Sequence, residues 1–248
     1  MLYNCAEHLI KQGDIKMKNQ ILLSSILTLL LAGTTLLSAN TSTQKTVHYT
    51  ASVIPKHMSV KEKKARFFAL LVPAVEKVHK ELEAEYLATK KLVAQNPNSP
   101  KIKALMKKYS AKNPQDLLVR MKPHPQSITL AQSAMESAWG TSRFLQEANN
   151  VFGVWSFNKN EPRVAAGKKR GKTTIYVKKY ATIADSIKDY YRVLATGRAF
   201  KGFRAAKMKT NNPYTLVKHL DKYSERGADY GKELASMIRY NKLTKYDD

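Results

Sequence analysis

A single carboxylate, Glu136, lies in the stretch LAQSAMESAWG at residues 130–140. Its neighbours are small, apolar or uncharged, although the whole chain carries 43 Lys and Arg against 19 Asp and Glu. An acid without an adjacent cation in so basic a chain calls for an explanation. Proton transfer is one, since acids held away from cations have the shifted pKa values typical of catalytic groups. The alternative is a glutamate that meets a lysine from elsewhere in the fold.

Helical geometry places Glu136 at the edge of a buried face. At about 100° per residue, seven residues form one continuous apolar arc: Ile128, Leu130, Ala131, Ala134, Met135, Ala138 and Trp139. Glu136 falls about 60° beyond this arc, on a polar strip that also holds Thr129, Gln132 and Ser133. Gly140 is predicted to end the helix in a left-handed conformation, which puts Glu136 in the last turn.

This position predicts a raised pKa for Glu136. Burial against Trp139, the negative end of the helix dipole and the lack of a local cation all disfavour the charged form. A carboxylic acid that stays protonated near neutral pH can protonate the leaving oxygen of a sugar. The position thus suits general-acid cleavage of a glycosidic bond, and a glutamate paired with a lysine from elsewhere in the fold stays the alternative.

Two motifs, AQSAMESAWG and SRFLQEANNVFG, resemble the glycoside hydrolase family 73 β-N-acetylglucosaminidases, and most closely the family's Bax-type members. These are lysozyme-like enzymes of bacterial cell walls, and the similarity extends over about residues 67–243. The resemblance implies cleavage of the β-1,4 bond after N-acetylglucosamine in peptidoglycan. Glu136 matches the family's general acid.

A second carboxylate is less well defined. Family members often carry an acid in a Thr-Glu-Tyr strand, but this chain reads TTIY, with Ile175 at the corresponding place. Glu161 is the only acid between Ala148 and Ala184, so it is the candidate for the base or for positioning water; otherwise it is a hairpin-tip residue. If Glu161 is remote, the substrate's N-acetyl group supplies the nucleophile, and retention and inversion both stay open.

The remaining site candidates come from aromatic and turn motifs. The sequence YSERGADY resembles the family's Tyr-Ala-Thr-Asp-x-x-Tyr motif, which implies that Tyr223 lies in the active site. The spacing from Tyr223 to Tyr230 is one residue longer than in the family, and Tyr230 is predicted to pack in the core with the last helix. Aromatic faces suit sugar rings, and the candidate substrate-binding residues are Asn150, Trp155, Tyr176 and Trp139.

The elements that position these residues are mostly helices. Apolar periodicity predicts helices over residues 60–91, 102–109, 114–121, 214–220 and 230–240. A capping box between Thr182 and Asp185 predicts the start of a further helix. Turn formers and β-branched residues predict a β-hairpin within 151–180. Pro73 is expected to kink or split the first helix. The predicted fold is mainly α, a lysozyme-like α+β architecture with a small β-hairpin lobe and an N-terminal helical extension.

The N-terminal region is predicted to direct export. From Met17, a possible true start, a lysine precedes an apolar run and then small residues near Ala39, which is the layout of a secretory signal peptide. A permanent membrane anchor is the alternative. We therefore divide the chain into a signal peptide (1–39), a flexible linker (40–59), a helical extension packed on the domain (60–125) and a glucosaminidase catalytic domain (126–245). The expected location is the periplasm or cell envelope.

The formal charge of +24 favours anionic partners, such as a cell wall, a lipid surface or nucleic acid. The alternative functions are a secreted nucleic-acid-binding protein and a non-catalytic wall-binding protein. KKRGK at residues 168–172 is predicted to be a solvated cluster at a hairpin tip, so no specific nucleic acid is expected. The scattered histidines lack metal-ligand spacing, and neither a metal nor a cofactor is expected. The single cysteine, Cys5, precedes Met17 and excludes a disulfide framework in the exported form.

Overall fold

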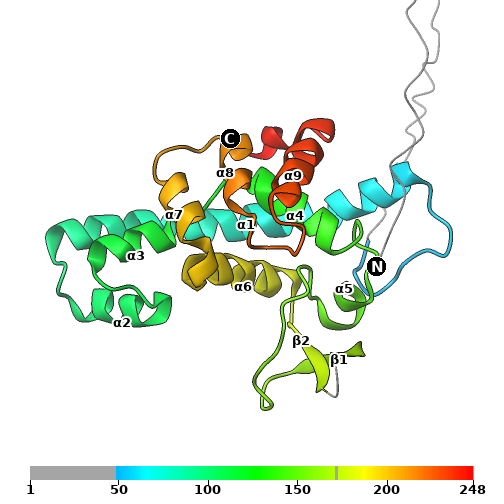
Figure 1. Ribbon diagram of the computed structural model, residues 1–248, viewed down its shortest axis with the longest axis horizontal. Coiled ribbons are helices and arrows are strands. Elements are labelled where there is room, and N and C mark those ends of the chain that lie inside the picture. The colour runs from blue at the N-terminus through cyan, green and yellow to red at the C-terminus, as the bar shows by residue number, and fades with distance from the viewer. Residues whose placement is uncertain (1–48, 171–172, 248) are drawn as a thin grey trace, which may run out of the picture. The chain divides into compact units, whose positions relative to one another are not determined.

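The computed structural model describes residues 49–170 and 173–247, and side chains are described except at 168–170 and 173. The first element is the long helix α1 (Val60–Gln95), which crosses the middle of the molecule (Figure 1). Ser59 and Glu62 form a reciprocal capping box at its start. The helix continues through Pro73, so the prediction that this proline splits it is wrong.

Two short helices follow α1. They are α2 (Pro100–Tyr109) and α3 (Pro114–Met121), each with a proline at its first position and a side-chain cap, from Ser99 and Asn113 respectively. Proline suits this position because its missing N–H has no helical partner there. The predicted boundaries of both helices are confirmed to within two residues.

The central segment contains α4 (Gln126–Glu136), α5 (Arg143–Ala148) and a hairpin of β1 (Arg163–Arg170) and β2 (Thr173–Lys178). The strands pair antiparallel with Val164 opposite Val177, and the register shifts between Ala165 and Lys169. Figure 1 shows this lobe extending away from the helices. The predicted hairpin is confirmed, whereas α5 was not predicted.

The C-terminal part is helical. It contains α6 (Ile183–Thr196), which starts at the predicted Thr182–Asp185 capping box, then α7 (Lys201–Lys207), α8 (Pro213–Leu216) and α9 (Ala228–Tyr240). Short 3-10 turns, η1 (Arg198–Phe200), η2 (Val217–His219) and η3 (Leu243–Tyr246), join or follow them. The helix α7 was not predicted.

One hydrophobic core joins α1, α4, α6 and α9. Helix α1 contributes Phe67, Leu71, Val75 and Val78, all fully buried, to the cluster that also contains Ile128 and residues of α6 and α9. A smaller cluster lies under α2 and α3 around Ile102 and Leu117. Helix α4 packs against both α1 and α9, so its C-terminal end is held from two sides.

The predicted mainly α architecture with one small β-lobe is confirmed for the described residues. The predicted signal peptide and residues 40–48 of the predicted linker lie outside them, as do the side chains of the 168–172 cluster. Within the part of the chain that is described, none of the helices combines the length and hydropathy needed to cross a bilayer.

Candidate active site

The site is built around a tight turn that follows α4. The helix ends at Glu136, four residues earlier than predicted, and Ala138, Trp139 and Gly140 all have positive φ. Two non-glycine residues in this region are uncommon and must be held by their surroundings. Ser137 provides part of the hold, because its hydroxyl donates to the Ser133 carbonyl at 2.6 Å and accepts from the Gly140 amide at 2.8 Å.

Arg66 of α1 also holds this turn, through hydrogen bonds to backbone carbonyls. Its side chain is 1% exposed, and Nη1 donates to the Gly140 carbonyl at 2.7 Å. Nη2 donates to carbonyls of the segment before α1, at Thr50 (2.6 Å) and Val53 (3.0 Å). The guanidinium therefore links three parts of the chain: α1, the segment before it and the turn after α4.

Glu136 is half-buried, and its pKa is raised above the ordinary glutamate value. Burial is the main cause, while a hydrogen bond from Tyr230 and the positive charge of Arg226 act in the opposite direction. Among the described residues, no salt bridge to Glu136 is found; Arg226 instead pairs with Glu233 and lies over the Tyr230 ring. The pKa direction agrees with the prediction from the sequence.

Two tyrosines from the C-terminal part stand beside this carboxylate. The Tyr230 hydroxyl donates to Glu136 Oε1 at 2.8 Å, and the Tyr223 ring stacks on the Tyr230 ring with centroids 5.5 Å apart. Burial is the main cause that raises the pKa of both phenols, and the charge of Glu136 adds to it. Tyr230 is fully buried as predicted, but its interpretation as a plain core residue missed this contact with Glu136.

Glu161 lies in the β-lobe with partners of its own. Its carboxylate accepts from the Ser156 hydroxyl at 2.7 Å and lies 3.6 Å from Lys178 Nζ. The Ser156 hydrogen bond is the main cause that lowers the pKa of Glu161. The Glu136 carboxyl therefore has a raised pKa and the Glu161 carboxyl a lowered one.

Comparison with known proteins assigns this arrangement to a family. Residues 111–243, more than half of the chain, match the glucosaminidase family, described as mannosyl-glycoprotein endo-β-N-acetylglucosaminidase. The chain belongs to the glucosaminidase family, here glycoside hydrolase family 73.

Individual relatives are also similar. The chain is 29% identical over 131 residues to protein bax of Escherichia coli (strain K12), which covers 50% of this chain and 46% of that protein. It is 27% identical over 141 residues to the exo-glucosaminidase LytG of Bacillus subtilis (strain 168), covering 49% and 46%. The matches thus span about half the length of both relatives.

A solved structure is also similar. The catalytic domain of the autolysin Auto from Listeria monocytogenes is 20% identical, with a TM-score of 0.47, over 77% of this chain and 92% of that domain.

Asn150 of this glucosaminidase organises the lobe from inside. It is 1% exposed, Nδ2 donates to the carbonyls of Val154 (3.0 Å) and Lys178 (2.9 Å), and Oδ1 accepts from the Val154 amide at 3.0 Å. Both amide hydrogens are used within the protein, and the role of Asn150 in substrate binding stays a prediction. The neighbouring Phe152 stacks on Tyr190 in the core.

The three aromatic candidates for sugar binding differ in exposure and in the side chains that contact their rings. Trp155 is 42% exposed and lies near Phe157, which is 86% exposed, so this pair offers apolar faces to solvent. Tyr176 has the Arg163 guanidinium 4.0 Å from its ring centroid. Trp139 packs edge-on against Phe67 and Phe68. Trp155 is therefore the best placed as a sugar platform.

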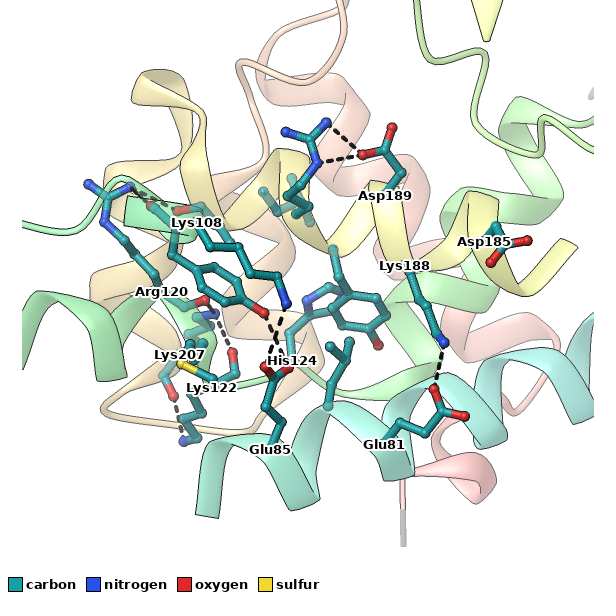
Figure 2. Close-up of a pocket in the computed structure, with 17 residues that line it drawn as sticks. Glu81, Glu85, Lys108, Arg120, Lys122, His124, Asp185, Lys188, Asp189 and Lys207 are labelled. Atoms are coloured by element: carbon teal, nitrogen blue, oxygen red, sulfur yellow. Dashed lines mark hydrogen bonds and ion pairs between the residues drawn. The ribbon is translucent and has the colours of Figure 1, made fainter. Parts of the chain in front are cut away.

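A separate cavity of about 410 Å³ lies between α1, α2, α3 and α6, and Glu136 is not among its lining residues. Its charged residues mostly pair with one another: Lys188 with Glu81, Lys108 with Glu85 and Arg192 with Asp189 (Figure 2). Among the described residues, no cluster of three or more His, Cys, Asp or Glu is placed to hold a metal ion. The cavity is thus a charged space distinct from the turn after α4, and six Lys and Arg against four Asp and Glu line it.

Proposed function

We propose that this glucosaminidase cleaves the β-1,4 bond after N-acetylglucosamine in peptidoglycan, with Glu136 as the general acid. The observation that carries the proposal is the half-buried Glu136 carboxyl, which has a raised pKa and a tyrosine donor but no ion pair among the described residues. Such a group keeps its proton closer to neutral pH and can pass it to the departing sugar oxygen. The family match and the glucosaminidase relative support the same reaction.

The other groups have supporting roles in this proposal. Glu161, with its lowered pKa, acts as base or positions water, and Tyr223 lies beside the acid as a further catalytic group. Trp155 and Tyr176 of the β-lobe contact the glycan, and Trp139 borders the acid. The net charge of +24 favours binding to an anionic wall or membrane surface.

The experiment is lysis of purified peptidoglycan by Glu136→Gln. We expect the variant to fold and to lose lysis by a factor on the order of 100 to 10,000, as removal of a general acid does. Glu147→Gln is the matched control, because Glu147 is an exposed glutamate paired only with Arg143 among the described residues, and it should lyse normally. Mass spectrometry of wild-type products should show N-acetylglucosamine at the new reducing ends. Full lysis by folded Glu136→Gln would remove Glu136 from the mechanism.

Export is part of the same proposal, because the proposed substrate lies outside the cytoplasm. The apolar segment after Met17 supports a cleaved signal peptide that leads to the periplasm or cell envelope. Cell fractionation with N-terminal sequencing tests it, and a mature start near residue 40 is expected. Retention of the full chain in the cytoplasm would contradict it.

A further inference from the structure

A chain of buried hydrogen bonds runs from His124 to the Glu136 carboxyl. His124 Nε2 lies 3.1 Å from the Tyr190 hydroxyl and 3.1 Å from the Thr129 hydroxyl, and Tyr190 donates to Gln132 Oε1 at 2.6 Å. Thr129 donates its own hydrogen to Tyr191, so it too can only accept from Nε2. Gln132 Nε2 donates to the Tyr230 hydroxyl at 2.9 Å, and that hydroxyl donates to Glu136 Oε1 at 2.8 Å. His124, Gln132, Tyr190 and Tyr230 are each at most 1% exposed, so water does not compete along the chain.

The Gln132 amide gives every link in this chain a direction. An amide nitrogen only donates and an amide oxygen only accepts. Tyr230 must therefore accept from Gln132, which leaves its single hydrogen for Glu136. On the other side, Tyr190 must give its hydrogen to Gln132, so its oxygen is free only to accept from His124. Nε2 of His124 thus carries a hydrogen, and all hydrogens in the chain point towards Glu136.

The direction decides which oxygen of Glu136 carries the acidic proton. Oε1 accepts from Tyr230, whose oxygen already accepts from Gln132 and so is a poor second acceptor for a proton on Oε1. The carboxyl proton is therefore placed on Oε2, the oxygen that does not face Tyr230. We propose that Gln132, Tyr190 and His124 are positioning residues, which hold Tyr230 as a donor to Oε1 and reserve Oε2 of Glu136 for proton donation to substrate.

The catalytic part of this inference rests on Glu136 being the acid, but the chain itself is testable without catalysis. The first experiment measures the ring nitrogens of His124 in the wild-type protein by long-range ¹⁵N–¹H NMR at neutral pH. We expect a neutral ring with hydrogen on Nε2. A ring protonated only on Nδ1 would reverse the chain and overturn the proposal.

The second experiment compares Tyr190→Phe with Tyr191→Phe. Tyr191 is a neighbour on α6 that is also buried and stacks on His124. Its hydroxyl accepts from Thr129, a side branch that reaches His124 Nε2 but not Gln132. Removing the Tyr190 hydroxyl frees the Gln132 amide to turn over and accept the hydrogen of Tyr230. Glu136 then loses its donor, while the other groups facing it, Tyr223 and Arg226, stay in place.

In Tyr190→Phe we expect the apparent pKa of Glu136 to rise by about one unit, as for loss of one hydrogen bond to a carboxylate. A ¹³C-carboxyl titration measures this directly, and the basic limb of kcat/KM for glycan lysis should move to higher pH by the same amount. Tyr191→Phe should leave both unchanged. Unshifted values in Tyr190→Phe, or equal shifts in both variants, would overturn the positioning role.

The two proposals fail in different ways. A wild-type protein that releases no glycan fragments, while the NMR results follow expectation, would refute the catalytic assignment and leave the chain intact. Normal lysis that depends on Glu136 but is insensitive to Tyr190→Phe at every pH would refute the positioning role and leave the catalytic assignment intact.

Discussion

Tyr230 and Glu136 lie 94 positions apart in the sequence, and a 2.8 Å hydrogen bond joins them in the fold. The bond connects the first turn of α9 to the last residue of α4, and both helices pack in the same core as α1. It opposes the effect of burial on Glu136, because a donor stabilises the charged carboxylate. Tyr230 therefore sets how far the pKa of the acid is raised.

Tyr230→Phe tests this balance. Loss of the donor disfavours the carboxylate, so the pKa of Glu136 should rise further. An acid must be protonated to act, and activity falls as pH rises through its pKa, so the basic limb of kcat/KM should move to higher pH. Gln132 Nε2 also loses its acceptor, which should lower the free energy of unfolding by about 1–3 kcal/mol. The measurements are pH–rate profiles of glycan lysis and urea unfolding.

Tyr240→Phe is the control for that substitution. Tyr240 belongs to the same helix but is 81% exposed, so neither the pH profile nor the stability should change. An unchanged basic limb in Tyr230→Phe would mean that the hydroxyl has no influence on the acid.

Glu161→Gln tests the second carboxylate. If an ionised Glu161 is the base, its amide analogue should lose kcat by a factor on the order of 100, and this is the outcome we expect. Lys178→Met is the matched variant, because it keeps the Glu161 carboxylate but removes the ion pairs of Lys178 with Glu161 at 3.6 Å and with Asp189 at 3.2 Å. It should retain most of the rate. Equal losses in the two variants would instead show that Glu161 only holds the β-lobe, and the N-acetyl group of the substrate would then be the nucleophile.

Local sequence patterns predicted the elements that depend on local chemistry. Thr182 and Asp185 form the capping box that was expected, because capping uses residues within one turn. The predicted helix ran past the observed end of α4, because that end depends on a residue far away in the sequence. Ala138 and Trp139 continue the apolar arc, but their positive φ is imposed by Ser137 and by Arg66 from a distant helix.

The sequence predicted only part of the candidate site, because several of its contacts join residues that are far apart in the chain. Glu136 stands out locally, since no cation is adjacent to it. The role of Gln132 could have been suspected from its place one turn before Glu136 on the same polar strip. For Tyr190 and Tyr230 the sequence predicted only burial on one face of a helix. A tyrosine that merely fills a core and one whose hydroxyl donates to a buried group have the same sequence pattern. Their hydroxyl partners depend on how α4, α6 and α9 meet.

Arg66→Met tests the support under the turn. Four carbonyl contacts are lost, at Gly140, Thr50, Ala51 and Val53, and a buried charge is removed with them. We expect the free energy of unfolding to fall by about 2–4 kcal/mol, since hydrogen bonds to charged groups are among the stronger ones. Glycan lysis should fall as well, because the turn holds the end of α4. Lys61→Met, at an exposed cation of the same helix, should change neither.

Lys207→Met tests the effect of a buried amine on stability. Lys207 is 4% exposed, and Nζ donates to the carbonyls of Arg120 and Lys122. Burial, with Arg204 and Lys122 nearby, lowers its pKa to about 7. Between this pKa and that of the unfolded chain, only the unfolded state binds the proton. Stability should therefore rise with pH from 7 to 9, by up to about 1.4 kcal/mol per pH unit from this group.

In Lys207→Met this contribution to the slope should disappear, so the variant falls furthest below the wild type at pH 9 and the gap narrows towards pH 7. His79 and His124, whose pKa values are lowered, are neutral in this window, and the buried tyrosines titrate above it. Urea unfolding at pH 7, 8 and 9 measures the slope, with Lys209→Met as the exposed control. Parallel pH dependences in Lys207→Met and the wild type would show that the amine keeps its charge in the folded core.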